Sequence, residues 1–168
     1  IVSVKIIREG KDAAKFDAPK VFTEIQEAMK NKLAEKEKLD ANAFESFLKD
    51  YYPDAKKTES GLYYVHTVEG TGVQPTAANQ VEVHYEGRFM DGKVFDSSIA
   101  RGETITFGLG QVIRGWTEGL QLMKEGGKTT LIIPYVLAYG AGARPPQIPP
   151  ISALIFDIVL IKIGIAHV

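Results

Sequence analysis

The sequence predicts an α+β protein, in which a small helical region precedes an antiparallel sheet that curls over one short helix. Three observations favour this class. In the first third of the chain, apolar residues recur three or four positions apart, as in an amphipathic helix. Short alternating or apolar segments separated by glycine and proline fill the rest, as in a series of strands. Only one short helical segment interrupts that series, which is typical of a sheet packed on a single helix.

The composition limits the function classes open to the chain. Twenty basic residues against 21 acidic ones leave a net charge of −1, so no basic surface for nucleic acid is expected. The lack of cysteine excludes disulfides, thiolate metal sites and a cysteine nucleophile. No apolar run approaches the roughly 20 residues of a membrane span. The chain opens on Ile1 and not on methionine, so we expect a processed or shortened protein whose targeting segment, if any, has been removed.

Residues 1–10, IVSVKIIREG, predict a β-strand, because Val2, Val4 and Ile6 alternate with polar residues. No second strand follows nearby. We therefore expect an orphan strand, the tail of a domain that precedes this numbering.

A helical arm is expected over residues 19–57. Its first helix has an apolar stripe of Phe22, Ile25, Met29 and Leu33. Asp40 or Asn42 is expected to cap a second helix, which Pro53 ends. The many charges indicate a solvated helix face, and the alternative is that the stripe packs against a second copy of the chain.

The polar stretch PDAKKTESG suggests a domain boundary, and residues 58–168 then form the sheet domain. Strands are expected within residues 61–70, 80–89, 103–107, 128–134 and 153–163. In the second of these, Val81, Val83 and Tyr85 should lie on one face. The last segment is apolar on both faces, as a central strand is. A short helix is expected around Trp116 to Met123.

Motifs for cofactors and metals fail on their spacing. GLGQVI lacks the third glycine of a dinucleotide loop, and EGGKTT lacks the first glycine of a phosphate loop. The three histidines show no metal-ligand spacing, and no G-x-S-x-G motif accompanies the serines. We therefore expect neither a metal nor a cofactor, and no nucleophilic hydrolase. The proline-rich loop AYGAGARPPQIPP is long for a passive connection, which favours a functional role.

Three stretches carry a resemblance to a known family: VEVHYEGRFMDGKVFDSS, FGLGQVIRGWTEGLQLMKEGGK and IPYVLAYGAGARPPQIPPISALIFDIVLIKI. In order and spacing they resemble the FKBP-type peptidyl-prolyl cis-trans isomerases, over residues 58–163. The resemblance implies a half-barrel of antiparallel strands around a short helix, with a pocket for a proline ring. It places Trp116 on the pocket floor, and Gly115 is expected to let the chain turn tightly enough to aim the indole inward. The remaining pocket positions are Tyr85, Phe95, Asp96, Phe107, Val112, Ile113, Tyr139, Ile148 and Phe156.

The resemblance also implies roles for these residues. The catalytic set is Asp96, Tyr139, Trp116 and Phe107, and Arg101 is expected to pair with Asp96. The Ile113 N–H and the Tyr139 hydroxyl would hold substrate carbonyls. Rotation about an X-Pro bond breaks amide resonance, so an apolar pocket that favours the twisted amide can catalyse it without a nucleophile. Asp96 would act electrostatically and not as a general acid, or would form a purely structural ion pair.

Ile105 departs from the human-type family members, which carry phenylalanine at the pocket rim, and the loop after Gly110 is two residues shorter. A slightly wider pocket is expected there, which bears on substrate preference and on affinity for macrolide inhibitors more than on the activity itself. The arm resembles that of bacterial Mip-like members, which implies a cell-envelope or periplasmic setting, with a cytoplasmic one left open, and a homodimer formed through the arm. Residues 1–10 resemble the closing strand of a cyclophilin-type domain, as in a fusion of the two isomerases. The expected partners are proline-containing, partly folded client proteins, and a chaperone or binding module with little turnover is the alternative function.

Overall fold

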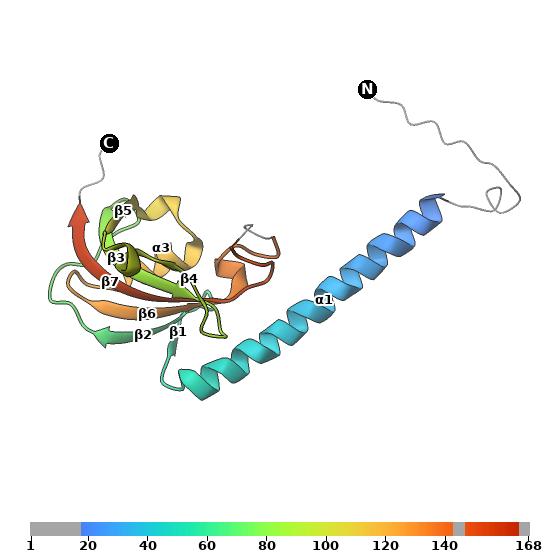
Figure 1. The fold of residues 1–168 in the computed structure, drawn as a ribbon, viewed down its shortest axis with the longest axis horizontal. Coiled ribbons are helices and arrows are strands. Elements are labelled where there is room, and N and C mark those ends of the chain that lie inside the picture. The colour runs from blue at the N-terminus through green and yellow to red at the C-terminus, as the bar shows by residue number, and fades with distance from the viewer. Residues whose placement is uncertain (1–17, 143–146, 165–168) are drawn as a thin grey trace, which may run out of the picture. The chain divides into compact units, whose positions relative to one another are not determined.

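The computed structural model describes residues 18–142 and 147–164, and Figure 1 shows their fold. The strand predicted over residues 1–10 lies outside the described residues, so it stays a prediction. The chain divides into two compact units, Ile1–Leu39 and Asp40–Val168. The division falls inside a helix, earlier than the boundary that the sequence suggests near residue 57.

One continuous helix, α1 (Ala18–Tyr51), occupies the place of the two predicted helices. The break predicted at Asp40 or Asn42 is therefore wrong. A capping side chain stabilises the start of a helix only where the backbone at that residue is not helical. No glycine or proline interrupts residues 20–52, so the backbone has no reason to leave the helix there. The good helix formers Ala41 and Ala43 flank Asn42 and carry the helix through. Its end two residues before Pro53 agrees with the prediction.

The part of α1 in the first unit has an exposed apolar stripe among many charges. The exposed fractions are 62% for Phe22, 47% for Ile25, 66% for Met29 and 42% for Leu33. The helix is long, but its charges keep it from being apolar enough to cross a membrane, and the same holds for every other helix in the described residues.

The part of α1 in the second unit packs on one face of the sheet. Leu48 is buried against Ile132 and Ile155, which come from two neighbouring strands. Phe44 meets the ring of Tyr63 edge-on, with 5.8 Å between the centroids. The last turns of the helix thus form a second, smaller core with the sheet domain.

Within the described residues, seven antiparallel strands form the sheet, in the order β1-β2-β6-β7-β3-β4, with β5 also paired to β3 (Figure 1). Their bounds are β1 Lys56–Lys57, β2 Tyr63–Val68, β3 Gln80–Arg88, β4 Val94–Ser97, β5 Ile105–Gly108, β6 Lys128–Ile133 and β7 Leu154–Gly164. The central place of β7, between β6 and β3, confirms the prediction from its apolar faces. Burial alternates along β3, which confirms the predicted faces. The short strands β1 and β4 were not predicted.

The main core lies between the sheet and α3 (Arg114–Gln121), the predicted short helix. Trp116 and Leu120 are buried on its inner side. Gly115 does not make the expected tight turn, because it is a helical residue without a positive φ. An added Cβ there would stand 2.5 Å from Cγ2 of Ile133, so glycine lets α3 approach the sheet closely. The prediction named the right residue for the wrong reason.

Three shorter helices complete the described fold: α2 (Ser98–Arg101) and the 3-10 helices η2 (Leu109–Gln111) and η3 (Tyr135–Leu137). α2 follows β4 directly, η2 leads into α3, and η3 opens the proline-rich loop. Of these three, η2 contributes Gln111 to the lining of a pocket beside α3, and η3 ends two residues before Tyr139, which also lines it.

Candidate active site

A pocket of about 490 Å³ opens beside α3. This volume lies within the usual range for sites that bind small molecules or side chains. Ten of the twelve site residues predicted from the sequence line it. The full lining is Tyr85, Phe95, Asp96, Ile105, Phe107, Gln111, Val112, Ile113, Trp116, Tyr139 and Phe156.

Trp116 forms the base of this pocket, with only 6% of its surface exposed. Three rings surround the indole: Tyr85 at 5.2 Å, Phe156 at 5.0 Å and Phe107 at 5.2 Å between centroids. Tyr85 and Phe156 meet it edge-on, the geometry that aligns the positive ring edge with the negative face. The indole Nε1 is buried and has no hydrogen-bond partner among the described residues. The base of the pocket is therefore aromatic.

One side wall depends on Gly87, which is not among the site residues predicted from the sequence. An added Cβ at this residue would stand 2.6 Å from Cε1 of Phe156 and 2.7 Å from Cζ of Phe95. The two rings close over the glycine and meet edge-on, with centroids 5.6 Å apart. A glycine inside an alternating strand is the signal that could have identified it, because such glycines often mark a close approach.

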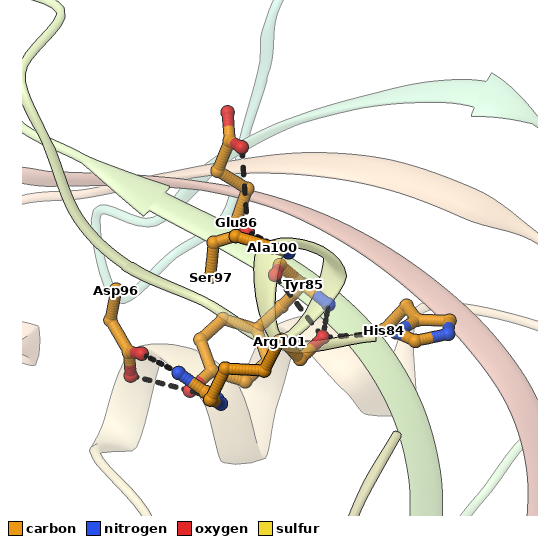
Figure 2. A network of polar contacts seen from close by, with 8 residues as sticks. His84, Tyr85, Glu86, Asp96, Ser97, Ala100 and Arg101 are labelled. Carbon is orange, nitrogen blue, oxygen red and sulfur yellow. Dashed lines mark hydrogen bonds and ion pairs between the residues drawn. The ribbon is translucent and has the colours of Figure 1, made fainter. Parts of the chain in front are cut away.

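The polar side of the pocket is a network of three side chains (Figure 2). The Tyr85 hydroxyl donates a hydrogen bond to Oδ2 of Asp96. Arg101 donates from one nitrogen to Oδ1 of Asp96 and from the other to the Tyr85 oxygen, at 3.1 Å. Both carboxylate oxygens of Asp96 are therefore engaged, and the carboxylate is oriented from two directions. The predicted pairing of Arg101 with Asp96 is present.

The network keeps Asp96 ionised. Burial alone would raise the pKa of the Asp96 carboxyl, but the hydrogen bonds from Tyr85 and Arg101 outweigh burial and hold that pKa below its ordinary value. Burial and the bond to Asp96 raise the pKa of the Tyr85 phenol. The hydrogen bond to Asp96 is the main reason that the pKa of Arg101 is raised. At neutral pH the pocket thus has a fixed negative charge beside a protonated phenol.

The opposite rim comes from the segment before α3 and from the proline-rich loop. Ile113 is the N-cap residue of α3, and its carbonyl accepts from the N–H groups of Trp116 and Thr117. None of the hydrogen bonds described for the chain uses the Ile113 N–H. Tyr139 lies just after η3 and lines the pocket. Ile105, 36% exposed, lies at the rim, where the sequence placed it.

Two predicted residues do not line the pocket, and one unpredicted residue does. Arg101 stands behind Asp96, with half of its side chain exposed. Ile148 is buried in the main core, where it supports the wall without lining it. Gln111 lines the rim, and a single amide within the apolar stretch GLGQVI was too weak a signal to predict it.

Fold and site together define a class of protein. Proteins of this class have an antiparallel half-barrel that holds an aromatic pocket against a short helix. Among the described residues, no serine, threonine or lysine lines that pocket. No group of three His, Asp or Glu side chains that could hold a metal occurs in the described part of the chain.

The chain belongs to the FKBP-type peptidyl-prolyl cis-trans isomerase family, whose sequence profile matches residues 72–161, more than half of the chain. It is 44% identical over 170 residues to the probable FKBP-type isomerase FkpA of Neisseria meningitidis, an alignment that covers 96% of this chain and 62% of the relative. It is 51% identical over 112 residues to the macrophage infectivity potentiator of Trypanosoma cruzi, covering 66% of this chain and 57% of the relative.

A solved structure shows the same fold. The crystal structure of FkpA from Escherichia coli superposes with a TM-score of 0.73 at 39% sequence identity, covering 89% of this chain and 68% of that chain. The chain spans about three-fifths of the length of the two curated relatives above. Family and fold are therefore established for the domain described here.

Proposed function

We propose that the protein is a peptidyl-prolyl cis-trans isomerase that speeds rotation about X-Pro bonds in partly folded proteins. The observation that carries this proposal is the pocket itself, an aromatic enclosure over Trp116 with an ionised carboxylate at one side. The barrier to X-Pro rotation, about 18–20 kcal/mol, comes from amide resonance. A catalyst for this reaction needs only to favour the twisted amide over the planar one.

The residues divide this work between them. Trp116, Phe107 and Tyr85 would enclose the proline ring and exclude water, which disfavours the charge-separated planar amide. The Ile113 N–H and the Tyr139 hydroxyl would hold the substrate carbonyls. Asp96 would act on the twisted amide through its charge, because a carboxyl with a lowered pKa is a poor proton donor at neutral pH. Arg101 would keep that carboxylate in place.

Exchange spectroscopy by NMR on a short X-Pro peptide tests the proposal. The wild type should accelerate cis-trans exchange, and Asp96→Ala and Tyr139→Phe should each lower kcat/KM by roughly 10- to 100-fold, since each removes one interaction made in the transition state. Lys124→Met is the control, because Lys124 pairs with exposed Glu69 outside the pocket. If the wild-type protein does not accelerate exchange, the proposed isomerase activity is refuted. Full activity in both variants would move the active site elsewhere.

A second function, chaperone binding, is favoured by the stripe on the first part of α1. Four large apolar side chains are exposed there, which gives unfolded chains a surface to bind. The truncation that tests it should remove residues 1–39 and not 1–57, because Phe44, Phe47 and Leu48 belong to the core of the second unit. Loss of aggregation suppression with full peptide turnover would assign the chaperone activity to the stripe. Equal loss of both activities would refute that division of labour.

The same stripe supports a homodimer, the other arrangement that would cover it. Sedimentation of the wild type and of Phe22→Ser/Met29→Ser would show whether dimers form and whether they depend on the stripe. Macrolide inhibitors would bind in the pocket and compete with the peptide. The envelope or periplasm is the proposed setting, which rests on the similarity of the arm to Mip-like relatives, and fractionation of the native cells tests it.

A further inference from the structure

Strand β3 has a gap on one edge, beside the active-site pocket. Along its other edge, β3 pairs with β7 over its whole length. On the gapped edge, β5 pairs with residues 80–83 and β4 pairs with residues 86–88. Between these two partners, Tyr85 has no strand neighbour on this edge. Its backbone N–H and C=O would be left unpaired in a buried place.

The side chain of Ser98 fills this gap. Its Oγ accepts a hydrogen bond from the Tyr85 N–H at 2.8 Å and donates to the Tyr85 carbonyl at 3.3 Å. Ser98 is completely buried, so water cannot replace it. A buried backbone group without a partner costs about 1–3 kcal/mol, and Ser98 prevents this twice. One hydroxyl thus stands in for a missing strand residue.

His84 makes the third contact of this hydroxyl, with 3.1 Å between Nδ1 and Oγ (Figure 2). A serine hydroxyl has one proton to donate and two lone pairs. With the Tyr85 N–H donating to Oγ, the single proton goes either to the Tyr85 carbonyl or to an unprotonated Nδ1. The position therefore requires both a donor and an acceptor, and alanine supplies neither.

The segment that holds Ser98 also determines the position of Arg101, the second hydrogen-bond partner of Asp96. The Ser97 hydroxyl caps α2 by accepting from the N–H of Ala100 at 3.1 Å. α2 lasts one turn and ends at Gly102, whose φ of 71° is left-handed. Arg101, the last residue of that turn, lies where it reaches Asp96 and Tyr85. Ser98 thus joins the Tyr85 backbone to the short helix that carries Arg101.

We propose that Ser98 is a positioning residue of the active site. It holds the Tyr85 backbone at the gap in β3, and so places the phenol against Asp96 and the ring edge against Trp116. It does not line the pocket and acts only through Tyr85. The effect on turnover rests on the proposed isomerase function, whereas the placement of the Tyr85 ring does not.

Thr129 offers a matched control. It is 1% exposed, and its Oγ1 lies 2.7 Å from Nδ1 of His66. Ser98→Ala and Thr129→Val therefore each remove a buried hydroxyl that contacts a histidine, and both should destabilise the fold in urea unfolding. Only Ser98→Ala should lower kcat/KM, by about tenfold, because a small misplacement of a catalytic group has such effects.

Two readouts separate positioning from plain loss of stability. Trp116 is the only tryptophan, and the Tyr85 ring touches it, so Ser98→Ala should shift its fluorescence while Thr129→Val should not. In the double variant Ser98→Ala/Tyr85→Phe, kcat/KM should fall no further than in Tyr85→Phe alone. If the alanine variant does not fold, Ser98→Cys gives the same comparison, because the thiol leaves no empty space and is only a weak hydrogen-bonding group.

Unchanged turnover and unchanged Trp116 fluorescence in Ser98→Ala would overturn the proposal. Fully additive losses in the double variant would also overturn it, since Ser98 would then act independently of Tyr85. If the wild type shows no isomerase activity, the proposed function fails, and the fluorescence comparison alone decides the role of Ser98. A fluorescence shift in both single variants would count against it.

Discussion

Gly115 of α3 faces Ile133 of β6 so closely that a Cβ at residue 115 would lie 2.5 Å from Cγ2 and 2.9 Å from Cδ1 of the isoleucine. The next residue along the helix is Trp116. The distance between α3 and the sheet, and with it the depth of the pocket floor, therefore depends on the absence of a side chain at residue 115. The largest apolar side chain stands beside glycine because the helix must approach the sheet there.

Gly115→Ala should destabilise the fold by about 1–3 kcal/mol, the usual effect of an extra methyl group in a packed core. Urea unfolding measures this. Ile133→Val removes one of the crowded atoms and should recover part of the loss in the double variant. Gly110→Ala is the control, since the nearest atom to its added Cβ is 3.9 Å away. Equal effects at the two glycines would contradict the packing explanation.

Gly87→Ala should damage the pocket more than the fold. The added methyl group would displace the rings of Phe95 and Phe156, which lie 2.7 and 2.6 Å from it. Phe156 also touches the Trp116 indole, so we expect kcat/KM to fall by roughly tenfold or more. A peptide exchange assay checks this. Gly87→Ala with normal turnover and normal Trp116 fluorescence would show that the wall can relax without consequence.

The pH dependence of turnover should be flat between about pH 5 and pH 9. Asp96, with its pKa lowered from 3.8, stays ionised over this range, and Tyr85, with its pKa raised from 10.0, stays protonated. A bell-shaped profile with a limb near neutral pH would instead indicate general acid–base catalysis. The measurement is kcat/KM for one peptide across the range, corrected for the uncatalysed rate.

The same lowered pKa has a consequence for stability. A carboxyl whose pKa is lower in the folded state stabilises the fold above its unfolded pKa, and that contribution is lost as pH falls through the folded pKa. The stability difference between wild type and Asp96→Asn should therefore be constant above about pH 5 and should shrink below about pH 4. Urea midpoints at several pH values test the sign. A difference that grows in acid would contradict it.

Arg88 joins the end of α1 to the sheet. It pairs with Asp157 of β7 and donates to the Tyr52 hydroxyl at 3.0 Å, while Thr130 of β6 donates to the other oxygen of Asp157. Arg88→Met should cost about 1–3 kcal/mol in urea unfolding, because it leaves a partly buried carboxylate without its cation.

Lys124→Met is the matched control for Arg88→Met. It breaks the pair with Glu69, whose side chain is 73% exposed, and should change stability by at most about 1 kcal/mol. In Arg88→Met/Asp157→Leu the carboxylate is absent, so part of the loss should return. Equal losses for the partly buried and the exposed pair would show that burial does not strengthen the interaction.

The pattern of apolar and polar residues predicted secondary structure correctly where an element is long or its periodicity is clear. The alternation in residues 80–89 predicted both β3 and its buried face, and the two-sided apolar run in residues 153–163 predicted the central place of β7. It failed at residues 40–42, where capping side chains indicated a helix start that the surrounding helix formers override. The short elements β1, β4 and α2 were missed, since two to four residues carry too little periodicity.

The aromatic residues of the pocket, its acid and its arginine could be named from the chain alone, because their order and spacing match a family. The structure had to show which of them meet. Ile148 lies in the core and not in the lining, Gln111 joins the rim, and Gly87 and Ser98 matter through contacts with residues far along the chain. Periodicity and spacing encode which elements form, because those depend on neighbours within a few residues. Distances between β3, β4 and α3 depend on how side chains from distant segments pack, and only the folded chain brings them together.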